Sequence, residues 1–473
     1  MKNIAWLLVV IGACTAFGVA PEIVEGSVSL TKGAAEVVKI AYTLTGEPAV
    51  VTVDIQTNTA SGASGEWVSI GGEAMGLLGG DANKVVYTLD EPSAAYWFPS
   101  VAFRGRAVAA GGIRAEVTAW PTNCPPDYMT IDLTAPTSTA WVVRRFYTST
   151  NALPGGFTNI AYKTSQLLMR KIPAAGVVWW MGAPSTQGGY RRWDVRHKVM
   201  LTEDYYAAVY ETTQAQYRNI NGAAGSPSFS TYVDSDVRPY CQARCDTLRG
   251  MNNSTMVYYW PENGHTVKVD SVIGKFRMKC GIADMDLPTD AQWEYACRAG
   301  TGTALPNGKT YTEANANEFA WTPGNPWDTA IVASTGESTS IKMPHAVGLK
   351  PPNNWGLYDM IGNVFEFTLD RFDGSTDWKE SANASQITEK VAIYTATFTP
   401  GWDDPDSPSV TTNPVGVTTT TVKTITKRGG AWMDNIDRCW SGARTSAGIA
   451  YVPAATSSYI GFRLFCSVKE AVK

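Results

Sequence analysis

Concentrated charge is missing from this 473-residue chain. Charged residues make up 17% of it, the formal net charge is −4, and no run of Lys or Arg occurs. A protein that follows a phosphate backbone needs a dense basic stripe, so we expect no nucleic-acid partner. Histidine is also scarce. The three present, His197, His265 and His345, are not at metal-ligand spacing, which argues against a three-histidine iron centre.

Common catalytic signatures and long apolar runs are missing as well. The chain has no Gly-x-Ser-x-Gly elbow, no His-Glu-x-x-His helix and no phosphate-binding loop. Beyond the N-terminus no segment reaches the ~20 apolar residues that a membrane-spanning helix needs. We therefore expect no transmembrane span and no familiar hydrolase or nucleotide-binding chemistry.

The first twenty residues have the three-part layout of a secretory signal. Lys2 precedes an apolar run from Ile4 to Ile11, and small residues follow up to Ala20. This pattern predicts a signal peptide over 1–20 and export to the periplasm, the cell surface or the medium. The segment ending at Cys14 also resembles a lipoprotein box, so a lipid attached to Cys14 is the alternative. Seven further cysteines would then meet an oxidising compartment, where pairing is the default.

Short alternating strands and turn residues dominate the segment 21–122. Apolar residues recur with period two, and clusters of Gly, Asn and Asp interrupt them. The pattern predicts an all-β sandwich of immunoglobulin type and shows no catalytic constellation. We expect a connecting segment over 123–169 and a second domain over 170–473.

Three helices are predicted in the second domain. Thr212 or Thr213 can cap a short helix that ends at Ile220, and a second helix is expected from Val237 to Arg249, with Cys241 and Cys245 on one face. Thr289-Asp290-Ala291-Gln292 is a capping box that begins the third, which Gly300 ends.

The third helix also begins a set of motifs that resemble those of the formylglycine-generating, or sulfatase-modifying factor, family. The motifs occur in the family's order and cover roughly 170–466. They are Met181-Gly182, Tyr210-Glu211-Thr212-Thr213, Leu287–Gly300, Trp355–Met360, Gly362–Phe367, Arg428–Trp432 and Gly461-Phe462-Arg463. The resemblance implies an α+β domain of the C-type-lectin-related, formylglycine-generating-enzyme-like fold, with little regular secondary structure.

The defining enzymes of that family oxidise a sulfatase cysteine to formylglycine with oxygen and copper(I), which two thiolates bind. By this resemblance, the first thiolate position holds Asp434 and the second holds Cys439. Ala431 stands at a serine position and Phe367 at a tryptophan position. One thiolate with a hard carboxylate is a poor copper(I) site, so we expect no copper and no oxidase activity.

Members of the family that are not oxidases imply another role for Cys439, a disulfide with Cys297 in the third helix. A redox or metal role and a buried free thiol are the alternatives. The resemblance also implies a structural calcium site in the turn Gly362-Asn363-Val364, with Glu366 giving a side-chain oxygen and carbonyls coming from around Gly362 and Val364. Alternatively, Glu366 only hydrogen-bonds loop amides.

The favoured hypothesis is an exported, non-catalytic binding module. Its ligand would be a glycan, a sulfatase-like protein or another cell-surface protein, with some of the 17 Trp and 21 Tyr available for stacking. The alternative is a divergent metal-dependent oxidase, or sulfatase-maturation enzyme, that uses Asp434 and Cys439.

Overall fold

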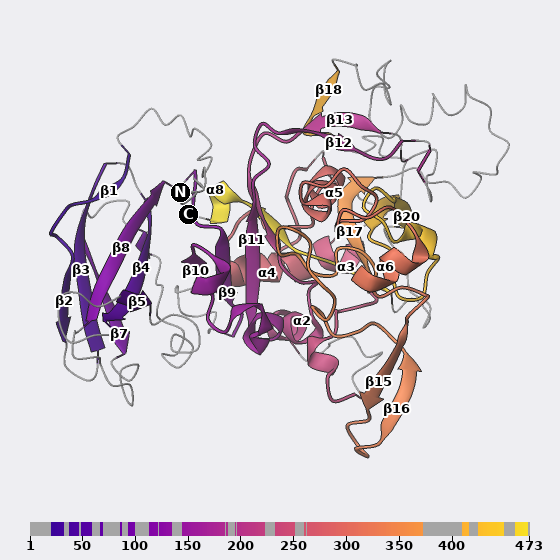
Figure 1. Cartoon of the computed structure of the whole chain (residues 1–473), viewed down its shortest axis with the longest axis horizontal. Helices are drawn as coiled ribbons and strands as arrows, with labels where there is room; N and C mark the ends of the chain where they lie inside the picture. The colour runs from indigo at the N-terminus through magenta and orange to yellow at the C-terminus, as the bar shows by residue number, and fades with distance from the viewer. Residues whose placement is uncertain are drawn as a thin grey trace, which may run out of the picture. The chain divides into compact units, whose positions relative to one another are not determined.

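The computed structural model divides the chain into two compact units (Figure 1). The first contains Met1–Pro126, Arg145–Phe157 and Val472–Lys473; the second contains Asp127–Arg144 and Thr158–Ala471. The structure describes residues 20–32, 37–46, 49–58, 67–69, 86–87, 93–99, 113–121, 123–134, 144–184, 186–187, 194, 196–222, 232–250, 260–261, 263–371, 409–415, 424–448 and 459–471. The expected signal peptide and Cys14 lie outside these residues, apart from Ala20.

The first unit contains two antiparallel sheets of four strands each. In one, β1 and β2 flank β3, which also pairs with β7; in the other, β5 and β6 pair with β4, which also pairs with β8. Two such sheets agree with an all-β unit. The strands are β1 Glu22–Ile23, β2 Ser29–Lys32, β3 Val37–Thr45, β4 Ala49–Asn58, β5 Trp67–Ser69, β6 Val86–Tyr87, β7 Ser93–Pro99 and β8 Ile113–Pro121.

The second unit combines helices with four small sheets. The sheet orders are β9-β11-β14-β22, β12-β13-β18, β15-β16 and β20-β19-β17-β21. The strands are β9 Tyr128–Asp132, β11 Gln166–Ile172, β12 Val178–Met181, β13 His197–Met200, β14 Tyr205–Ala208, β15 Trp327–Ile331, β16 Ser338–Lys342, β17 Phe365–Arg371, β18 Val410–Thr412, β19 Thr424–Arg428, β20 Thr445–Gly448, β21 Ile460–Gly461 and β22 Phe465–Ser467. Strand β10, Arg144–Tyr147, consists mostly of residues of the first unit.

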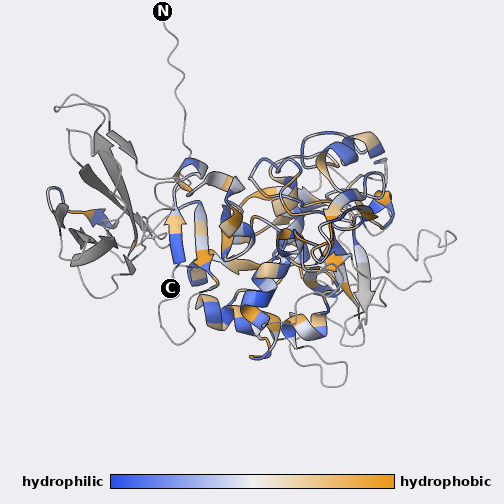
Figure 2. Ribbon diagram, turned by 90° about the horizontal axis from the view of Figure 1, so that it is seen from below, coloured by the Kyte–Doolittle hydropathy of each residue, from blue (hydrophilic) through white to orange (hydrophobic). Residues whose placement is uncertain are grey.

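Short helices connect and cover these sheets. The α-helices are α2 Gln214–Asn221, α3 Cys245–Arg249, α4 Val272–Cys280, α5 Asp290–Arg298, α6 Glu313–Phe319 and α8 Val468–Ala471; the 3-10 turns are η2 Thr150–Ala152, η3 Gly156–Thr158, η4 Ile160–Lys163, η6 Ser235–Val237 and η7 Ile436–Arg438. Among the described residues no helix is long and apolar enough to cross a membrane, and Figure 2 shows hydrophilic and hydrophobic residues mixed along the helices.

The second unit begins before the predicted boundary at residue 170. Strand β9 pairs antiparallel with β11 from Tyr128↔Arg170 to Asp132↔Gln166, so part of the expected connecting segment belongs to this sheet. Strand β8 ends at Pro121, and Pro125 and Pro126 stand just before Asp127, where the second unit begins.

Two of the three predicted helices are confirmed. Thr213 caps α2 and Thr289 caps α5, and in both cases a Gln three residues later completes a capping box. The predicted helix from Val237 to Arg249 is wrong, because only Cys245–Arg249 is α-helical. Pro239 forms a β-bridge with Thr213, and Gln242 has a φ of 65°, which a continuous right-handed helix does not allow.

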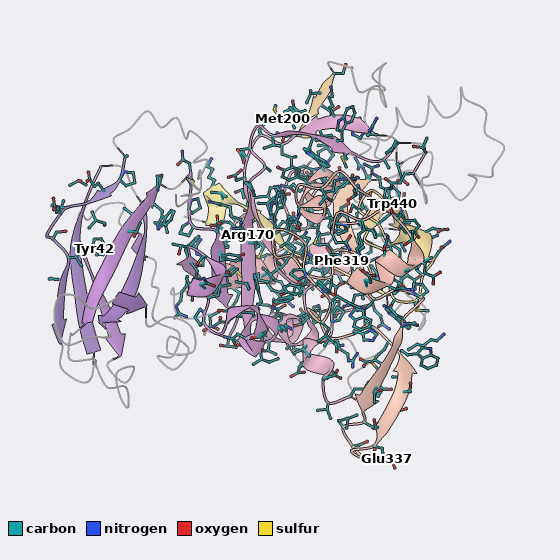
Figure 3. All side chains as sticks on the ribbon, in the orientation of Figure 1. Tyr42, Arg170, Met200, Phe319, Glu337 and Trp440 are labelled. Carbon is teal, nitrogen blue, oxygen red and sulfur yellow. The ribbon has the colours of Figure 1, made fainter. Side chains whose placement is uncertain are left out.

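The core of the second unit is centred on β17, where all seven residues are buried. It pairs antiparallel with β19 and parallel with β21. The hairpin β15–β16 projects from the unit, and Glu337 marks its turn end in Figure 3. Helix α5 and the start of β17 carry two of the seven family-like motifs, and the other motifs contact them from distant parts of the chain.

Candidate functional site

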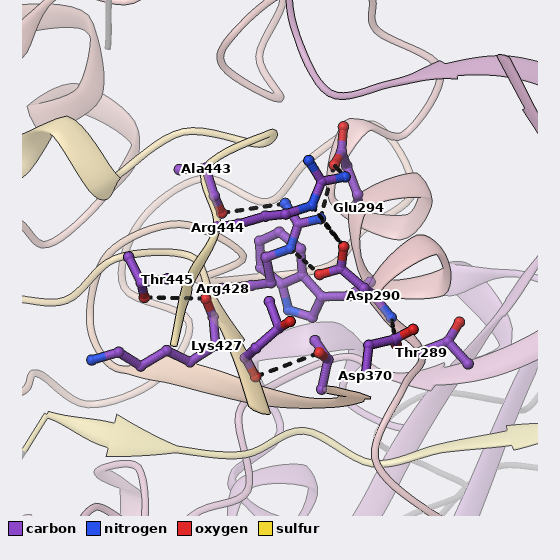
Figure 4. A network of polar contacts seen from close by, with 12 residues as sticks. Thr289, Asp290, Glu294, Asp370, Lys427, Arg428, Ala443, Arg444 and Thr445 are labelled. Carbon is purple, nitrogen blue, oxygen red and sulfur yellow. Dashed lines mark hydrogen bonds and ion pairs between the residues drawn. The ribbon is translucent and has the colours of Figure 1, made fainter. Parts of the chain in front are cut away.

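An ionic network joins α5 to β19 and to the segment after it (Figure 4). The buried Arg428 guanidinium pairs with Asp290, at 2.6 Å from Nη2 to Oδ2, and with Glu294, at 3.0 Å from Nη2 to Oε2. Arg444 Nε donates to Asp290 Oδ2 at 2.8 Å. Burial alone would raise the pKa of the Asp290 carboxyl, but Arg428 and Arg444 outweigh it and hold that pKa well below its usual range.

The same network fixes the Met181-Gly182 motif. Glu294 Oε1 accepts from the Gly182 amide at 2.7 Å, and Arg298 Nη2 donates to the Gly182 carbonyl at 2.6 Å. Glu294 and Arg298 of α5 therefore hold this distant segment of the chain in place.

The Gly-Gly turn after β19 packs directly on Cys439. Gly430 has a φ of 75°, and a Cβ there would lie 2.5 Å from the Cys439 Sγ. Cys439 is fully buried directly after η7. Burial, and then the nearby Asp434 carboxylate, raise the pKa of the Cys439 thiol to about 12. The side chain at the second thiolate position is therefore a protonated thiol at neutral pH.

Asp434, at the first thiolate position, has a different partner. Its Oδ2 lies 2.5 Å from Arg438 Nη1, and its Oδ1 accepts from the Asn435 amide at 2.7 Å. A carboxylate paired with arginine and a buried thiol do not fit copper(I), which prefers soft thiolates. Ala431 and Phe367 are fully buried packing residues.

The predicted Cys297–Cys439 disulfide is not formed. All seven cysteines within the described residues are free thiols, and both members of this pair are buried. Cys297 lies on α5 with its Sγ 3.9 Å from the Met360 carbonyl oxygen. Burial raises its pKa to about 12, although a hydrogen bond with Ser441 lowers it in part. The geometry corresponds to the buried-thiol alternative.

Glu366, the glutamate of the predicted calcium site, accepts hydrogen bonds from side-chain N–H groups. Glu366 Oε1 accepts from Arg463 Nη2 at 2.7 Å, and its Oε2 accepts from Trp293 Nε1 at 2.7 Å. The residues present therefore do not fit a calcium ion at this carboxylate. Within the part of the chain that the structure describes, no loop amide donates to the Glu366 carboxylate, and calcium binding stays a prediction.

Asn363 and Gly362 shape that turn. Asn363 Oδ1 accepts from the His345 amide at 2.9 Å, and its Nδ2 donates to Glu211 Oε2 at 2.7 Å. Val364 donates its amide to Glu211 Oε1 at 3.1 Å. Gly362 has a φ of 77°, and a Cβ there would lie 2.3 Å from the Trp321 carbonyl oxygen, so only glycine fits.

Sequence reasoning missed a group of buried acids behind this turn. Glu211 and Asp359 lie near Glu366 and Arg463, and all four side chains are buried. Burial, followed by the charges of Asp359 and Glu366, raises the pKa of Glu211. Burial also raises the pKa of Asp359 to about 6, against the lowering effect of a hydrogen bond from the Gly348 amide. The motif Tyr210-Glu211-Thr212-Thr213 was the available signal.

Comparison with known proteins agrees with this arrangement of motifs. The Sulfatase-modifying factor enzyme 1-like domain family matches residues 166–468. The formylglycine-generating enzyme of Mus musculus is 29% identical over 192 residues, which are 39% of this chain and 40% of that enzyme. The "Inactive C-alpha-formylglycine-generating enzyme 2" of Bos taurus is 30% identical over 101 residues, or 21% and 31% of the two chains.

Both matches span less than half the length of these relatives. A solved structure, Treponema denticola variable protein 1, superposes with a TM-score of 0.40 and 20% identity, covering 64% of this chain and 95% of that one. The family match extends over more than half of the sequence and includes the motifs described above. This chain belongs to the Sulfatase-modifying factor enzyme 1-like family.

Proposed function

We propose that this protein is an exported binding module of its family that does not oxidise cysteine to formylglycine. The observation that carries the proposal is the chemistry at the two thiolate positions, where Asp434 is paired with Arg438 and Cys439 is a buried thiol with a raised pKa. Two relatives, from Bos taurus and Mus musculus, are themselves named inactive. The ligand would be a glycan or another exported protein.

An oxidation assay tests this proposal. The purified, copper-loaded protein is incubated aerobically with a reductant and a cysteine-containing sulfatase peptide, and mass spectrometry follows the peptide. We expect no conversion to formylglycine. Multiple turnover by the unaltered protein, abolished in the variant Cys439→Ser, would contradict the proposal. The formylglycine-generating enzyme of Mus musculus serves as the positive control for the assay.

A divergent oxidase is the second candidate, because Cys439 is retained and the Mus musculus relative is named for that activity. It would need the buried thiol to ionise and a further soft ligand. Metal analysis separates the candidates: the divergent oxidase predicts a metal ion on the unaltered protein that Cys439→Ser removes, whereas the binding module predicts none in either protein.

The remaining parts of the proposal concern architecture and export. We infer that the second unit has the C-type-lectin-related fold and that the first is immunoglobulin-like, which an experimental structure would test. The mature N-terminus separates cleavage after Ala20 from lipid attachment at Cys14. Mass spectrometry of protein from its native host would distinguish the two, and retention of the full 1–20 segment would contradict export by either route.

A further inference from the structure

Two adjoining open pockets lie on the second unit, away from the thiolate positions. Their volumes are about 300 and 270 Å³, and they share Glu203, His265 and Gln292. Neither is lined by Asp434 or Cys439. Apolar side chains of Leu201, Leu287 and Phe465 contribute to the lining. We call the two pockets together the His265 groove.

His265 lines both pockets of the groove, and Asp286 orients its ring. Its Nδ1 lies 3.2 Å from Oδ2 of the buried Asp286, whose two oxygens also accept from Arg249, each at 3.0 Å. Burial would raise the pKa of Asp286, but Arg249 and His265 outweigh it and lower that pKa, so the carboxylate is ionised and acts as an acceptor. The Asp286 carboxylate therefore accepts a hydrogen bond from Nδ1–H of His265 and fixes the orientation of the imidazole ring.

The indole ring of Trp260 lies beside the imidazole ring of His265. The ring centroids of Trp260 and His265 are 4.9 Å apart, with 46° between the ring planes. Trp260 lines one pocket, and His265 lines both. Tryptophan has the most favourable aromatic face for a cation.

The remaining polar lining is rich in carboxylates. Glu203 is exposed and has no ionic or hydrogen-bond partner among the described residues. Asp284 accepts from the Ser467 amide through Oδ2 at 3.2 Å, while its buried Oδ1 has no hydrogen-bond partner in the described part of the chain. Glu470 also lines the groove, and the one Lys or Arg among the lining residues is Lys469. An unsatisfied buried acceptor is unfavourable, and a donor on a ligand would satisfy it.

We propose that the His265 groove binds the guanidinium group of an arginine side chain presented by a peptide. A guanidinium has five N–H donors and no acceptor, which matches a lining that contains the carboxylates of Glu203, Asp284 and Glu470. The planar faces of a guanidinium also stack on aromatic rings, and Trp260 provides such a ring in one of the two pockets. This inference rests on the proposed binding role and gives it a site and a class of ligand.

Calorimetric titration with three small probes tests the assignment of the ligand. The probes are the Nα-acetyl amides of L-arginine, of L-citrulline, which has nearly the same shape without the charge, and of L-lysine. We expect the arginine compound to bind at least tenfold more tightly than the other two. No heat from the arginine compound, or equal affinity for arginine and citrulline, would overturn the proposal. Equal affinity for lysine would overturn the guanidinium assignment.

Matched variants test the location of the site. Glu203→Gln and Asp284→Asn should each weaken binding of the arginine compound at least fivefold, with little change in the melting temperature. Glu337→Gln, at the tip of the β15–β16 hairpin, is the control and should change the affinity less than twofold. Unchanged affinity in both groove variants would place binding elsewhere. Because no copper is involved, a negative result here leaves the test of oxidase activity unaffected.

Discussion

At the scale of single residues, the chemistry of the thiolate positions follows from burial. Cys297 and Cys439 are both fully buried, and burial raises the pKa of each thiol to about 12. A thiol that is neither ionised nor exposed does not react readily or bind a soft metal. Both cysteines are therefore packing residues in this account.

Alkylation with iodoacetamide checks this assignment. In the native protein without reductant, Cys297 and Cys439 should remain unlabelled because both are buried. In guanidinium chloride, still without reductant, both should be labelled fully. Peptide mass spectrometry reads the labels. If the two cysteines were alkylated only after reduction, they would form the disulfide that the family resemblance implied.

Gly430 provides a second test at this scale. Gly430→Ala places a methyl group 2.5 Å from the Cys439 Sγ, at a φ of 75° that side chains rarely adopt. We expect a loss of about 2–4 kcal/mol in the free energy of unfolding, measured with urea. The control is Gly308→Ala, at a φ of 81° with no atom within 4 Å, which should lose only about 1–2 kcal/mol. Equal losses would mean that the turn does not pack against the thiol.

At the scale of elements, buried ion pairs connect helix α5 to strand β19. Arg428 on β19 pairs with Asp290 and Glu294 on α5, and Arg298 extends the contact to the loop at Gly182. Removing one member of a buried pair leaves an uncompensated charge, which is costly.

Arg428→Met should lower the free energy of unfolding by about 3 kcal/mol, because Asp290 and Glu294 then lose one buried cation while Arg444 and Arg298 remain. The matched control is Arg438→Met, whose partly exposed pair with Asp434 should contribute at most about 1 kcal/mol. Denaturant unfolding of the two variants checks the difference. Similar losses would contradict the structural role of the network.

Local signals predicted some of these elements and failed for others. Thr213 and Thr289 lie three residues from the Gln that completes each capping box. Both residues of each interaction are therefore visible in one short stretch of sequence. The helix from Val237 failed because Pro239 pairs with Thr213, a contact between segments distant in the chain. The cluster around Glu211 and the His265 groove also form from distant segments, and no spacing in the sequence indicates them.

At the scale of the whole molecule, the buried acids make stability depend on pH. The pKa of Asp359 is raised to about 6 in the folded protein. A raised pKa means that the folded state binds the proton more tightly, so this contribution is present at low pH and is lost as the pH rises through about 6.

The free energy of unfolding should therefore fall by about 1 kcal/mol between pH 5 and pH 7 through Asp359. In Asp359→Asn this part of the dependence should disappear, and Asn also tolerates the φ of 54° at this position. Urea unfolding across the pH range provides the measurement. A variant with the same slope as the unaltered protein would show that Asp359 does not titrate there.

The central claim is that this family member lacks the copper(I) site of the oxidases, and copper titration tests it most directly. The reduced protein competes for copper(I) with a coloured chelator, alongside the variant Cys439→Ser. The account predicts no stoichiometric copper on the unaltered protein and no change in Cys439→Ser. One tightly bound copper per chain that is lost in Cys439→Ser would contradict it.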